Sequence, residues 1–383
     1  MTAIIPYGRQ HIDQSDIDAV VATLQSDFLT QGPKVAEFEK KFAQYVGSKF
    51  AVAIANGTGA LHLSAIALGI KPGVNVITTP ITFSASANCV RYCGGNVYFA
   101  DIDPDTFLID LEKVRTLIES KPKGFFSGII PVDFAGYPVN MEAFRSLANQ
   151  YSLWILEDAC HAPGGYFIDS KGIKQNCGNG NFADLAVFSF HPVKHIACGE
   201  GGMITTNNES LYRHLLKLRT HGITRDPNEM HENHGGWYME MQELGFNYRM
   251  PDVLCALGIS QLAKADHGLE RRIAIAKKYD AELKKNPTIQ LPKWPLGHAF
   301  HLYIIQHPDR TGLYNFLRSK NIYTQVHYVP VHWMPYYQSL GNQKGDFPAA
   351  ENYYAHCLSL PIYSSLTERE LDYVISCINS YSI

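Results

Sequence analysis

The sequence predicts an α/β protein with a mainly parallel sheet in a large domain and a smaller α+β domain after it. Three features support this prediction: a length of 383 residues, short apolar runs that alternate with helical patterns from Phe50 to about Thr206, and a long helical pattern after Pro251. A chain of this length is too long for one ordinary core and suits two domains. Strands that alternate with helices are typical of a parallel sheet covered by helices on both faces.

Seven apolar runs are the expected strands of this sheet. They are Ala51–Ala55, Val74–Thr79, Asn96–Ala100, Ser127–Val132, Leu153–Leu156, Leu185–Phe188 and Met203–Thr205. Polar or glycine-bearing segments follow several of them, at Asn56–Gly59, Asp101–Asp103 and Glu157–His161. Ligands of open α/β sheets bind at the carboxyl ends of the strands, so we expect the functional site there.

Two further segments leave the regular pattern. Residues 164–183 are rich in Gly, Asn and Asp, which indicates an excursion from the sheet, and residues 226–236 indicate a mobile surface loop. Pro251 begins a helical pattern that continues to about Lys285, with interruptions at Gly258 and Gly268. We expect it to link a large domain, residues 1–250 with an N-terminal arm, to a small C-terminal domain within residues 251–383.

Composition narrows the range of functions. Hydrophobic residues make up 46% of the chain, charged residues 18%, and the net charge is −3, as in a globular protein without basic blocks. This disfavours nucleic acid and anionic membranes as partners and favours small molecules. The eight cysteines are scattered and are expected to be reduced, and no apolar stretch is long enough to span a membrane. We therefore expect a cytoplasmic protein.

The segment Ser189–Lys194, followed by Gly199–Gly202, has the strongest chemical signal. A lysine alone is usually a surface cation, but this one follows a buried-looking strand. Asp158 follows another strand and is expected at the same sheet edge, although an aspartate there could also be a helix N-cap. An imine-forming lysine and an aspartate that keeps a pyridine nitrogen protonated are what pyridoxal phosphate chemistry requires.

Two other features suit the same cofactor. Asn56–Gly59 lies between a strand and a helix expected to begin near Ala60, where free backbone N–H groups could hold a phosphate. The same residues could equally form an ordinary tight turn. Phe83 could cover the face of a planar ring, although such an aromatic is more often part of the core.

Four motifs together resemble the DegT/StrS family of sugar-nucleotide aminotransferases. They are the Ser-Phe-His-x-x-Lys sequence ending at Lys194, Glu157-Asp158-Ala159, Asn56-Gly57-Thr58 and Gly245–Met250. The resemblance extends from Phe28–Pro33 to Leu358–Pro361. It implies the aspartate-aminotransferase fold (fold type I), pyridoxal 5'-phosphate, and a homodimer whose two sites lie at the subunit interface.

The resemblance also implies roles for individual residues. Lys194 would form the imine and afterwards carry a proton, and Asp158 would face the pyridine nitrogen. The residues expected to hold the phosphate are Thr58, Gly59, Ser189 and, from the other subunit, Asn247. Phe83 would stack on the ring. His161 stands where many relatives have glutamine, and its imidazole could hydrogen-bond the cofactor's phenolic oxygen.

Within the family, the Lys194 segment and Glu200 are most similar to the branch that aminates the fourth sugar carbon. This implies glutamate as donor and a UDP-linked 4-keto-6-deoxy-N-acetylhexosamine as acceptor. The residues expected to line the sugar pocket are Tyr7, Thr30, Gln31, Gly32, His327 and Tyr328. Arg225 would meet the pyrophosphate.

Four alternatives remain at this point. The acceptor could be a different nucleotide-linked keto sugar (dTDP- or GDP-linked, or 3-keto). The chain could be a sugar dehydratase, although that enzyme has histidine in place of the lysine and His195 is one position too late. A ligand-sensing regulator would normally add a DNA-binding module. A metal site at His191, His195 and Cys198 would need a helix, whereas Pro192 predicts a loop, so no metal is expected.

Overall fold

The structure, a computed structural model, describes residues 4–382; residues 1–3 and 383, at the outer ends of the two predicted domains, lie outside it. Within the described residues, seven strands form the central sheet in the order β2-β10-β9-β6-β5-β3-β4. Their bounds are β2 (Phe50–Ile54), β3 (Asn75–Thr78), β4 (Asn96–Phe99), β5 (Phe126–Ile130), β6 (Trp154–Asp158), β9 (Leu185–Ser189) and β10 (Gly202–Thr206). Each overlaps one of the seven predicted runs, so the predicted strands are confirmed.

Strand direction explains which ends meet. β10 is antiparallel to its neighbours β2 and β9, and the other pairs in the sheet are parallel. The predicted mainly parallel sheet is therefore confirmed. The carboxyl ends of β2, β3, β5, β6 and β9 lie at one edge, together with the amino end of β10.

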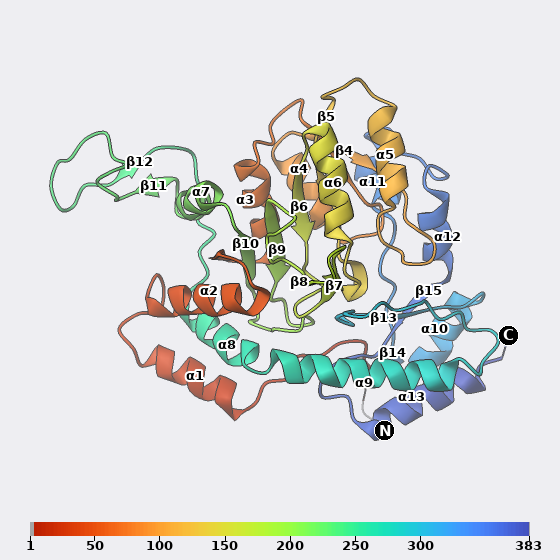
Figure 1. Cartoon of the computed structure of the whole chain (residues 1–383). Helices are drawn as coiled ribbons and strands as arrows, with labels where there is room; N and C mark the ends of the chain where they lie inside the picture. Colours follow the sequence, from red (N-terminus) through yellow and green to blue (C-terminus); the bar gives the residue numbers. More distant parts are fainter. Residues whose placement is uncertain (1–3, 383) are drawn as a thin grey trace.

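Helices cover both faces of the sheet (Figure 1). Leu156 of β6 shares a buried cluster with α3 (Gly57–Ala67), α4 (Ala85–Tyr92) and α7 (Glu209–Arg219). Ile155, one residue earlier, shares a different cluster with α5 (Leu111–Glu119) and α6 (Met141–Tyr151). Successive side chains of a strand point to opposite faces, so the two clusters lie on opposite sides of the sheet.

A separate buried cluster surrounds the C-terminal elements. It joins α9 (Ala265–Leu283), α10 (Arg310–Ser319) and α13 (Glu368–Ser380) to the strand pair β13 (Tyr303–Gln306) and β15 (Cys357–Leu360). Ile5 belongs to this cluster because β1 (Ile5–Pro6) pairs with β14 (Ile322–Tyr323). The division at residues 250 and 251 stays a prediction.

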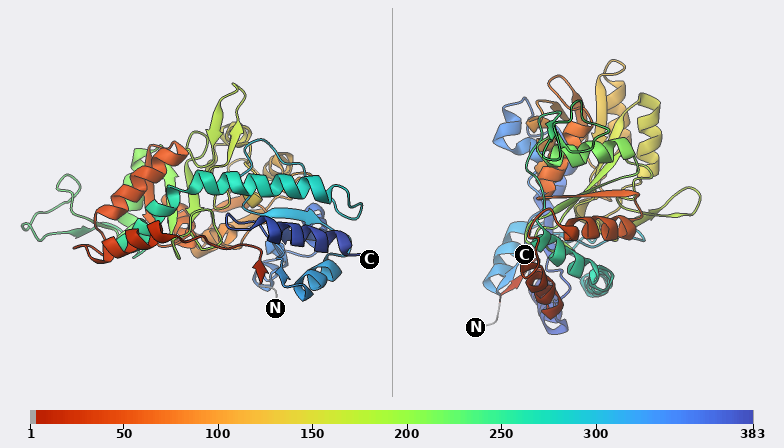
Figure 2. Two further views of the ribbon diagram at one scale, coloured as in Figure 1. Left: turned by 90° about the horizontal axis from the view of Figure 1, so that it is seen from below. Right: turned by 90° about the vertical axis from the view of Figure 1, so that its left-hand side faces the viewer.

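The long helical pattern after Pro251 forms two helices, α8 (Asp252–Leu262) and α9. The break lies at residues 263–264, so the interruptions predicted at Gly258 and Gly268 are wrong. Gly258 lies within α8, where its lack of a side chain allows close packing: a Cβ there would lie 2.7 Å from the ring of Phe38, on α2 (Pro33–Val46). Figure 2 shows α9 running toward the C-terminal part of the molecule.

The remaining segments are short or peripheral. Residues 164–183 contain the small hairpin β7 (Tyr166–Ile168) and β8 (Lys174–Asn176), as the excursion predicted. The projecting hairpin, residues 223–241 with β11 (Ile223–Thr224) and β12 (Glu240–Met241), extends away from the body of the molecule (Figures 1 and 2). The other elements are α1 (Gln14–Leu24), η1 (Phe134–Gly136), η2 (Val331–Trp333), α11 (Pro335–Gln338) and α12 (Pro348–His356). None of the helices in residues 4–382 combines the length and the apolar composition needed to cross a bilayer.

Candidate active site

A cavity of about 820 Å³ opens at the edge where the parallel strands end. The predicted residues that line it are Tyr7, Thr58, Gly59, Phe83, Asp158, His161, Ser189, Lys194, His327 and Tyr328. They come from six separate stretches of the chain. The sheet edge brings most of these stretches together, as expected for an open α/β sheet.

Lys194 lies in the loop between β9 and β10. The loop is anchored by Phe190, which is fully buried, donates its backbone N–H to Gly201 O at 2.8 Å and accepts that of Cys198 at 2.8 Å. Pro192 and Gly199 lie in this irregular stretch, so the predicted loop is confirmed. Burial lowers the pKa of Lys194, while the charges of Cys160 and Asp158 act in the opposite direction. A lowered pKa favours the neutral amine, which is the nucleophilic form.

Asp158 is the last residue of β6 and is 5% exposed. Its backbone N–H donates to Pro131 O at 2.9 Å, which fixes the strand end beside β5. One carboxylate oxygen accepts from Ser86 Oγ at 2.6 Å and the other from the backbone N–H of Cys160 at 3.2 Å. Within the described residues no helix begins after Asp158, so the alternative role as a helix N-cap does not apply. The carboxyl group is therefore held in a fixed position in the cavity wall.

The turn after β2 forms a tight cradle. Asn56 is the N-cap of α3, and its side chain accepts the N–H of Gly59 at 2.8 Å; the helix begins at Gly57, three residues before the predicted start. A Cβ at Gly57 would lie 2.9 Å from Ser189 Cβ, and one at Gly202 would lie 2.7 Å from the backbone of Asn56. Side chains are thus excluded where backbone N–H groups at a helix N-terminus face the cavity, an arrangement that suits a phosphate.

Phe83 and Tyr328 are aromatic walls of the cavity. Phe83 is 59% exposed, so it is not the core aromatic that was the alternative interpretation. Its ring centroid lies 6.2 Å from that of Tyr328. A large apolar ring left uncovered in a cavity can stack on a planar ligand. Tyr7, on the N-terminal segment, contacts the ring of His327 with centroids 5.1 Å apart.

His161 lies beneath this aromatic wall and is 5% exposed. Its Nδ1 accepts the backbone N–H of Ala135 at 3.2 Å, and its Nε2 lies 3.3 Å from Tyr328 Oη. The ring of His301 packs against it with centroids 4.3 Å apart. Burial lowers the pKa of His161 well below its ordinary value, and the charge of Lys194 lowers it further.

Five predicted site residues do not line the cavity of the single chain, and their roles stay predictions. They are Thr30, Gln31, Gly32, Arg225 and Asn247. Gly32 is the N-cap of α2 and donates its N–H to Asp252 Oδ2 at 2.7 Å. Arg225 and Asn247 are exposed.

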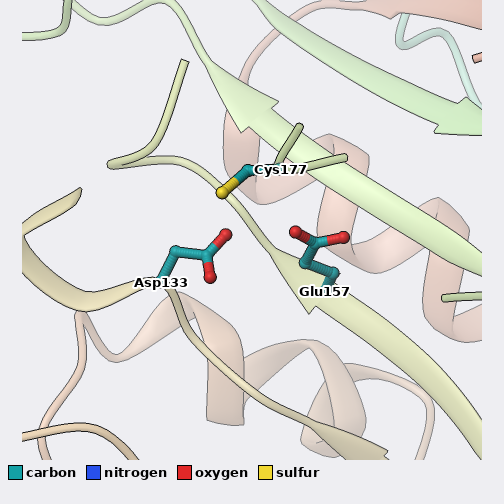
Figure 3. A group of neighbouring side chains, drawn as sticks. All are labelled: Asp133, Glu157 and Cys177. Atoms are coloured by element: carbon teal, nitrogen blue, oxygen red, sulfur yellow. The ribbon is translucent and has the colours of Figure 1, made fainter. Parts of the chain in front are cut away.

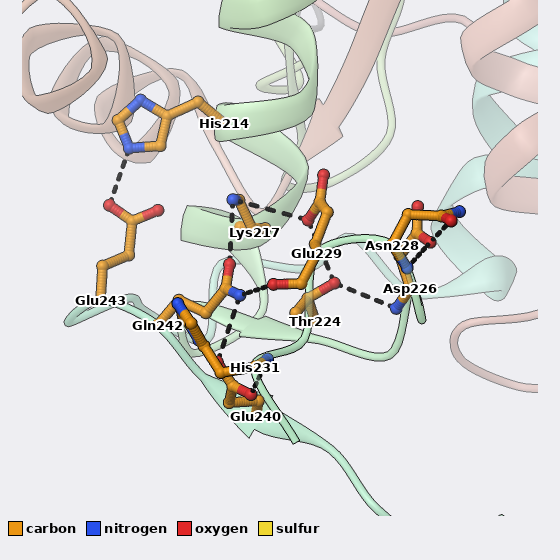
Figure 4. Close-up of polar contacts among 10 residues, drawn as sticks. All are labelled: His214, Lys217, Thr224, Asp226, Asn228, Glu229, His231, Glu240, Gln242 and Glu243. Carbon is orange, nitrogen blue, oxygen red and sulfur yellow. Dashed lines mark hydrogen bonds and ion pairs between the residues drawn. The ribbon is translucent and has the colours of Figure 1, made fainter. Parts of the chain in front are cut away.

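Arg225 belongs to the projecting hairpin, whose base is fixed by a polar network (Figure 4). Lys217 of α7 donates to Gln242 at 3.2 Å and lies 3.6 Å from Glu229. His214, also on α7, pairs with Glu243 at 2.7 Å. Farther out, Trp237 is 79% exposed. The hairpin is anchored at its base and exposes a large apolar side chain farther out, as expected of a segment that meets another surface.

A second polar group lies behind the cavity wall: Asp133, Glu157 and Cys177 face one another (Figure 3). Their ligand atoms are close enough for a metal ion, and all three are buried. Burial raises the pKa values of Asp133, Glu157 and Cys177 above their ordinary values, which favours the protonated form of each side chain. The histidines considered for a metal site in the Lys194 loop are not part of this group.

Sequence reasoning missed several residues of the cavity, of which Cys160 and Ser86 contact or adjoin predicted site residues. Cys160 lies in the wall next to His161, within a segment that the sequence had marked for Asp158 and His161 but not for its cysteine. Ser86 donates to Asp158 from 72 positions earlier in the chain. A serine in the first turn of a helix is too common to have indicated this contact.

The chain is similar to known proteins over nearly its whole length. The profile of the DegT/DnrJ/EryC1/StrS aminotransferase family matches residues 10–379. The UDP-4-amino-4,6-dideoxy-N-acetyl-beta-L-altrosamine transaminase of Campylobacter jejuni is 39% identical, over 97% of this chain and 96% of that protein.

The fold of the chain is also similar to that of solved aminotransferase structures. Helicobacter pylori PseC, an aminotransferase involved in the biosynthesis of pseudoaminic acid, has a TM-score of 0.86 at 29% identity and covers 98% of both chains. Spr1654 of Streptococcus pneumoniae, solved in its PMP form, has a TM-score of 0.90 at 27% identity over 98% of both chains. The predicted aminotransferase fold is thereby confirmed.

Proposed function

This chain belongs to the DegT/DnrJ/EryC1/StrS aminotransferase family, and we propose that it transfers an amino group from glutamate to the fourth carbon of a UDP-linked 4-keto-6-deoxy-N-acetylhexosamine. The observation that supports the reaction most directly is Lys194 in a cavity that also contains the carboxylate of Asp158. The choice of sugar rests on similarity, because the Campylobacter jejuni relative is named for a UDP-linked 4-amino-4,6-dideoxy sugar and the Helicobacter pylori one for pseudoaminic acid.

Pyridoxal 5'-phosphate is the cofactor of this proposal, and the residues of the cavity suit it. Gly57, Thr58 and Gly59 line the cavity at the N-terminus of α3, where backbone N–H groups suit a phosphate, and the turn is packed too closely for a Cβ at Gly57 or Gly202. When bound, the cofactor supplies a protonated pyridine ring that can accept electrons from the reacting carbon. Asp158 would accept the ring's N–H, and Phe83 would cover one face of the ring. Thr58, Gly59 and Ser189 would hold the phosphate, with Asn247 of the partner subunit.

Lys194 would have two tasks. It would hold the cofactor as an imine, and once displaced by glutamate its amine would move a proton to and from the carbon that carries nitrogen. A general base must be unprotonated, and burial lowers the pKa of Lys194 in that direction. The amine would pass that proton to the imine carbon of the cofactor within the first half of the reaction and would make the reverse transfer, from that carbon to the sugar carbon, in the second half.

The sugar nucleotide would meet residues from both subunits of a homodimer in the cytoplasm. Tyr7, His327 and Tyr328 line the cavity and would contact the sugar. The predicted substrate-binding residues that lie outside the cavity of one chain would come from the other subunit. They are Thr30, Gln31, Gly32 and Arg225. The exposed Trp237 of the projecting hairpin is consistent with such an interface.

The dehydratase alternative is disfavoured by the geometry. It requires a histidine in place of the reactive lysine, whereas Lys194 lines the cavity and His195 is not among the residues that line it. Other acceptors, whether dTDP-linked, GDP-linked or 3-keto sugars, remain competitors for the same chemistry.

Two measurements test the proposal. Borohydride reduction of the reconstituted protein should fix the cofactor on the peptide that contains Lys194, and Lys194→Ala should bind cofactor without transaminating. Cofactor fixed on another lysine, or none bound, would refute the mechanism. A coupled assay with glutamate and a panel of UDP- and dTDP-linked 3-keto and 4-keto sugars, with the amino position determined by NMR, tests the substrate. Turnover confined to a 3-keto or dTDP-linked sugar would refute that assignment alone.

A further inference from the structure

The cavity wall that contains His327 and Tyr328 belongs to a segment without regular secondary structure. This wall segment, residues 326–330, lies between an isolated bridge at Gln325 and the short helix η2. His327 is nevertheless buried, at 6% exposure, and both side chains line the cavity. Since no helix or strand of its own fixes the wall segment, contacts with other elements must set the position of these two side chains.

One such contact comes from Tyr353 of α12. Its hydroxyl donates to the backbone carbonyl oxygen of His327 at 2.6 Å, and Tyr353 is 2% exposed, so the bond is shielded from water. Its ring packs against Phe107 and Phe134, with centroids 4.5 and 5.9 Å away. Burial raises the pKa of Tyr353 well above its ordinary value, so the phenol keeps its proton and remains a donor.

A second residue of α12 holds the far end of the wall segment. Glu351 pairs with His332 Nε2 at 2.9 Å and accepts the backbone N–H of Gly345 at 2.6 Å. His332 is fully buried in η2, which directly follows the wall segment. One helix therefore contacts the chain on both sides of Tyr328.

The N-terminus of α12 is in turn fixed to the central sheet. Asp101, two residues beyond the end of β4, accepts the backbone N–H groups of Ala349 and Ala350 at 3.0 Å each, one on each carboxylate oxygen. N–H groups in the first turn of a helix have no partner inside the helix, and a carboxylate there is favourable. Direct contacts thus run from the sheet through α12 to the cavity wall.

The side chain of His327 has an attachment of its own. Its Nδ1 lies 2.8 Å from Ser359 Oγ, on β15. Tyr353 holds the backbone of His327 and Ser359 holds its ring, so loss of the Tyr353 hydroxyl would loosen the wall without releasing the imidazole completely. The expected effect is therefore weaker binding at the wall and not a loss of the site.

We propose that Tyr353 is a positioning residue for the acceptor sugar, which acts by holding His327 through its backbone carbonyl. Tyr353 does not itself line the cavity. The proposal rests on the proposed function, in which His327 contacts the sugar. Lys194, Asp158 and the phosphate cradle lie on other elements, so none of the groups assigned to the half-reaction with glutamate is attached to α12.

Steady-state and single-turnover kinetics of Tyr353→Phe test this role, because the substitution removes the hydroxyl and keeps the packed ring. The KM for the UDP-linked 4-keto sugar should rise about three- to tenfold, the scale on which one buried hydrogen bond contributes. The kcat should stay within about twofold, since the lost contact serves the bound sugar equally before and during the reaction. The half-reaction with glutamate, followed as loss of the imine absorbance without sugar, should also stay within about twofold.

Tyr363→Phe is the matched control. Tyr363 is 1% exposed, and its hydroxyl makes no hydrogen bond within residues 4–382, so its removal should leave the KM for the sugar unchanged. An unchanged KM in Tyr353→Phe would overturn the proposal. Equal losses in both half-reactions would overturn it as well, because they would indicate a general structural role.

Hydrogen–deuterium exchange of the cofactor-free protein tests the positioning without turnover. The N–H of Val331, at the end of the wall segment, donates to Pro80 O at 2.9 Å. In Tyr353→Phe the peptide with residues 325–331 should exchange about three- to tenfold faster, while a peptide from β9 and the Tyr363→Phe protein should not change. Unchanged exchange of the wall segment would overturn the positioning role. A wild-type protein that aminates no nucleotide sugar would instead refute the proposed function, and the exchange rates would still decide whether Tyr353 holds the wall.

Discussion

Ser86 Oγ donates a hydrogen bond to Asp158 Oδ2 across 2.6 Å, and this contact joins the first turn of α4 to the end of β6. Both residues are buried, so the bond is shielded from water and holds one carboxylate oxygen in a fixed direction. The second oxygen accepts from Cys160 N. The orientation of Asp158 is therefore set by the protein before any ligand binds.

Asp158→Asn should retain the fold and lose most of the transamination rate, by roughly 100-fold or more. The amide preserves the shape but removes the negative charge that would keep the pyridine nitrogen protonated. Steady-state kinetics measure the effect, with circular dichroism as a check of folding. Ser86→Ala is the matched control, because it keeps the charge and removes one hydrogen bond, and it should cost less than about tenfold. A near-normal rate in Asp158→Asn would restrict Asp158 to a structural role.

Gly202→Ala should weaken cofactor binding at least tenfold and destabilise the protein by about 1–3 kcal/mol. The added Cβ would lie 2.7 Å from the backbone of Asn56 and 3.0 Å from Gly57 N, so the cradle has to shift. Titration of the cofactor-free protein and thermal unfolding measure the two effects. Gly236→Ala, where a Cβ meets nothing within 4 Å, should change stability by less than about 0.5 kcal/mol. Equal behaviour of the two variants would contradict the cradle.

The sequence was sufficient for the strands and for much of the site. Apolar runs such as Leu153–Leu156 match the observed strands because a strand buried on both faces has few other compositions available. Lys194 and Asp158 could be linked because each follows such a run, and parallel strands end at one edge. The direction of β10 was not predictable, since Met203–Thr205 has the same apolar character in either direction.

Contacts between distant segments were beyond the sequence. Gly258 was expected to interrupt a helix, yet its lack of a side chain serves the approach of Phe38 from another helix. The pairing of Ala135 with His161 depends on a left-handed alanine, and nothing in the residue type signals that conformation. Such features follow from tertiary packing, which local propensity does not encode.

Mild acid should destabilise the cofactor-free protein. Burial lowers the pKa values of His161, His298, His301 and His327, to about 3 for His298 and His327, against an ordinary value near 6.5. At a pH between the lowered pKa values and the ordinary one, the unfolded chain binds protons that the folded chain does not. The free energy of unfolding therefore falls as pH falls from 7.5 to 5.5. Each histidine contributes about 1.4 kcal/mol over that range.

The buried acids act in the opposite direction. The pKa values of Asp133 and Glu157 are raised, so the folded chain keeps protons that the unfolded chain has lost, and their contribution to stability declines as pH rises. Burial also lowers the pKa of His195, and these five histidines, at about 1.4 kcal/mol each, outweigh two carboxyls that contribute at most about 2.7 kcal/mol each over two pH units, so the thermal midpoint should be lower at pH 5.5 than at 7.5. His298→Gln should lessen that difference. A midpoint that rises on acidification would show that the histidines are not held neutral.

The last prediction concerns the subunit from which Asn247 acts. In the single chain Asn247 is exposed, bridges to Thr220 near the base of the projecting hairpin and does not line the cavity that contains Lys194. If Asn247 serves the phosphate of the neighbouring subunit, each active site needs Lys194 from one chain and Asn247 from the other.

Mixing Lys194→Ala with Asn247→Ala subunits should then restore part of the activity. In a mixed dimer one site carries both substitutions and the other carries neither, so the second site is complete. With free exchange about half of the dimers are mixed, and each has one intact site out of two, so recovery should approach a quarter of the wild-type rate, an estimate that assumes independent symmetric sites. Subunit exchange is verified by mass spectrometry of differently tagged chains, and a mixture of Lys194→Ala with Asp158→Asn, two substitutions expected to act in the same site, should recover nothing. Exchange without recovery in the first mixture would mean that Asn247 acts within its own chain, because only a shared site lets two defective chains form an active one.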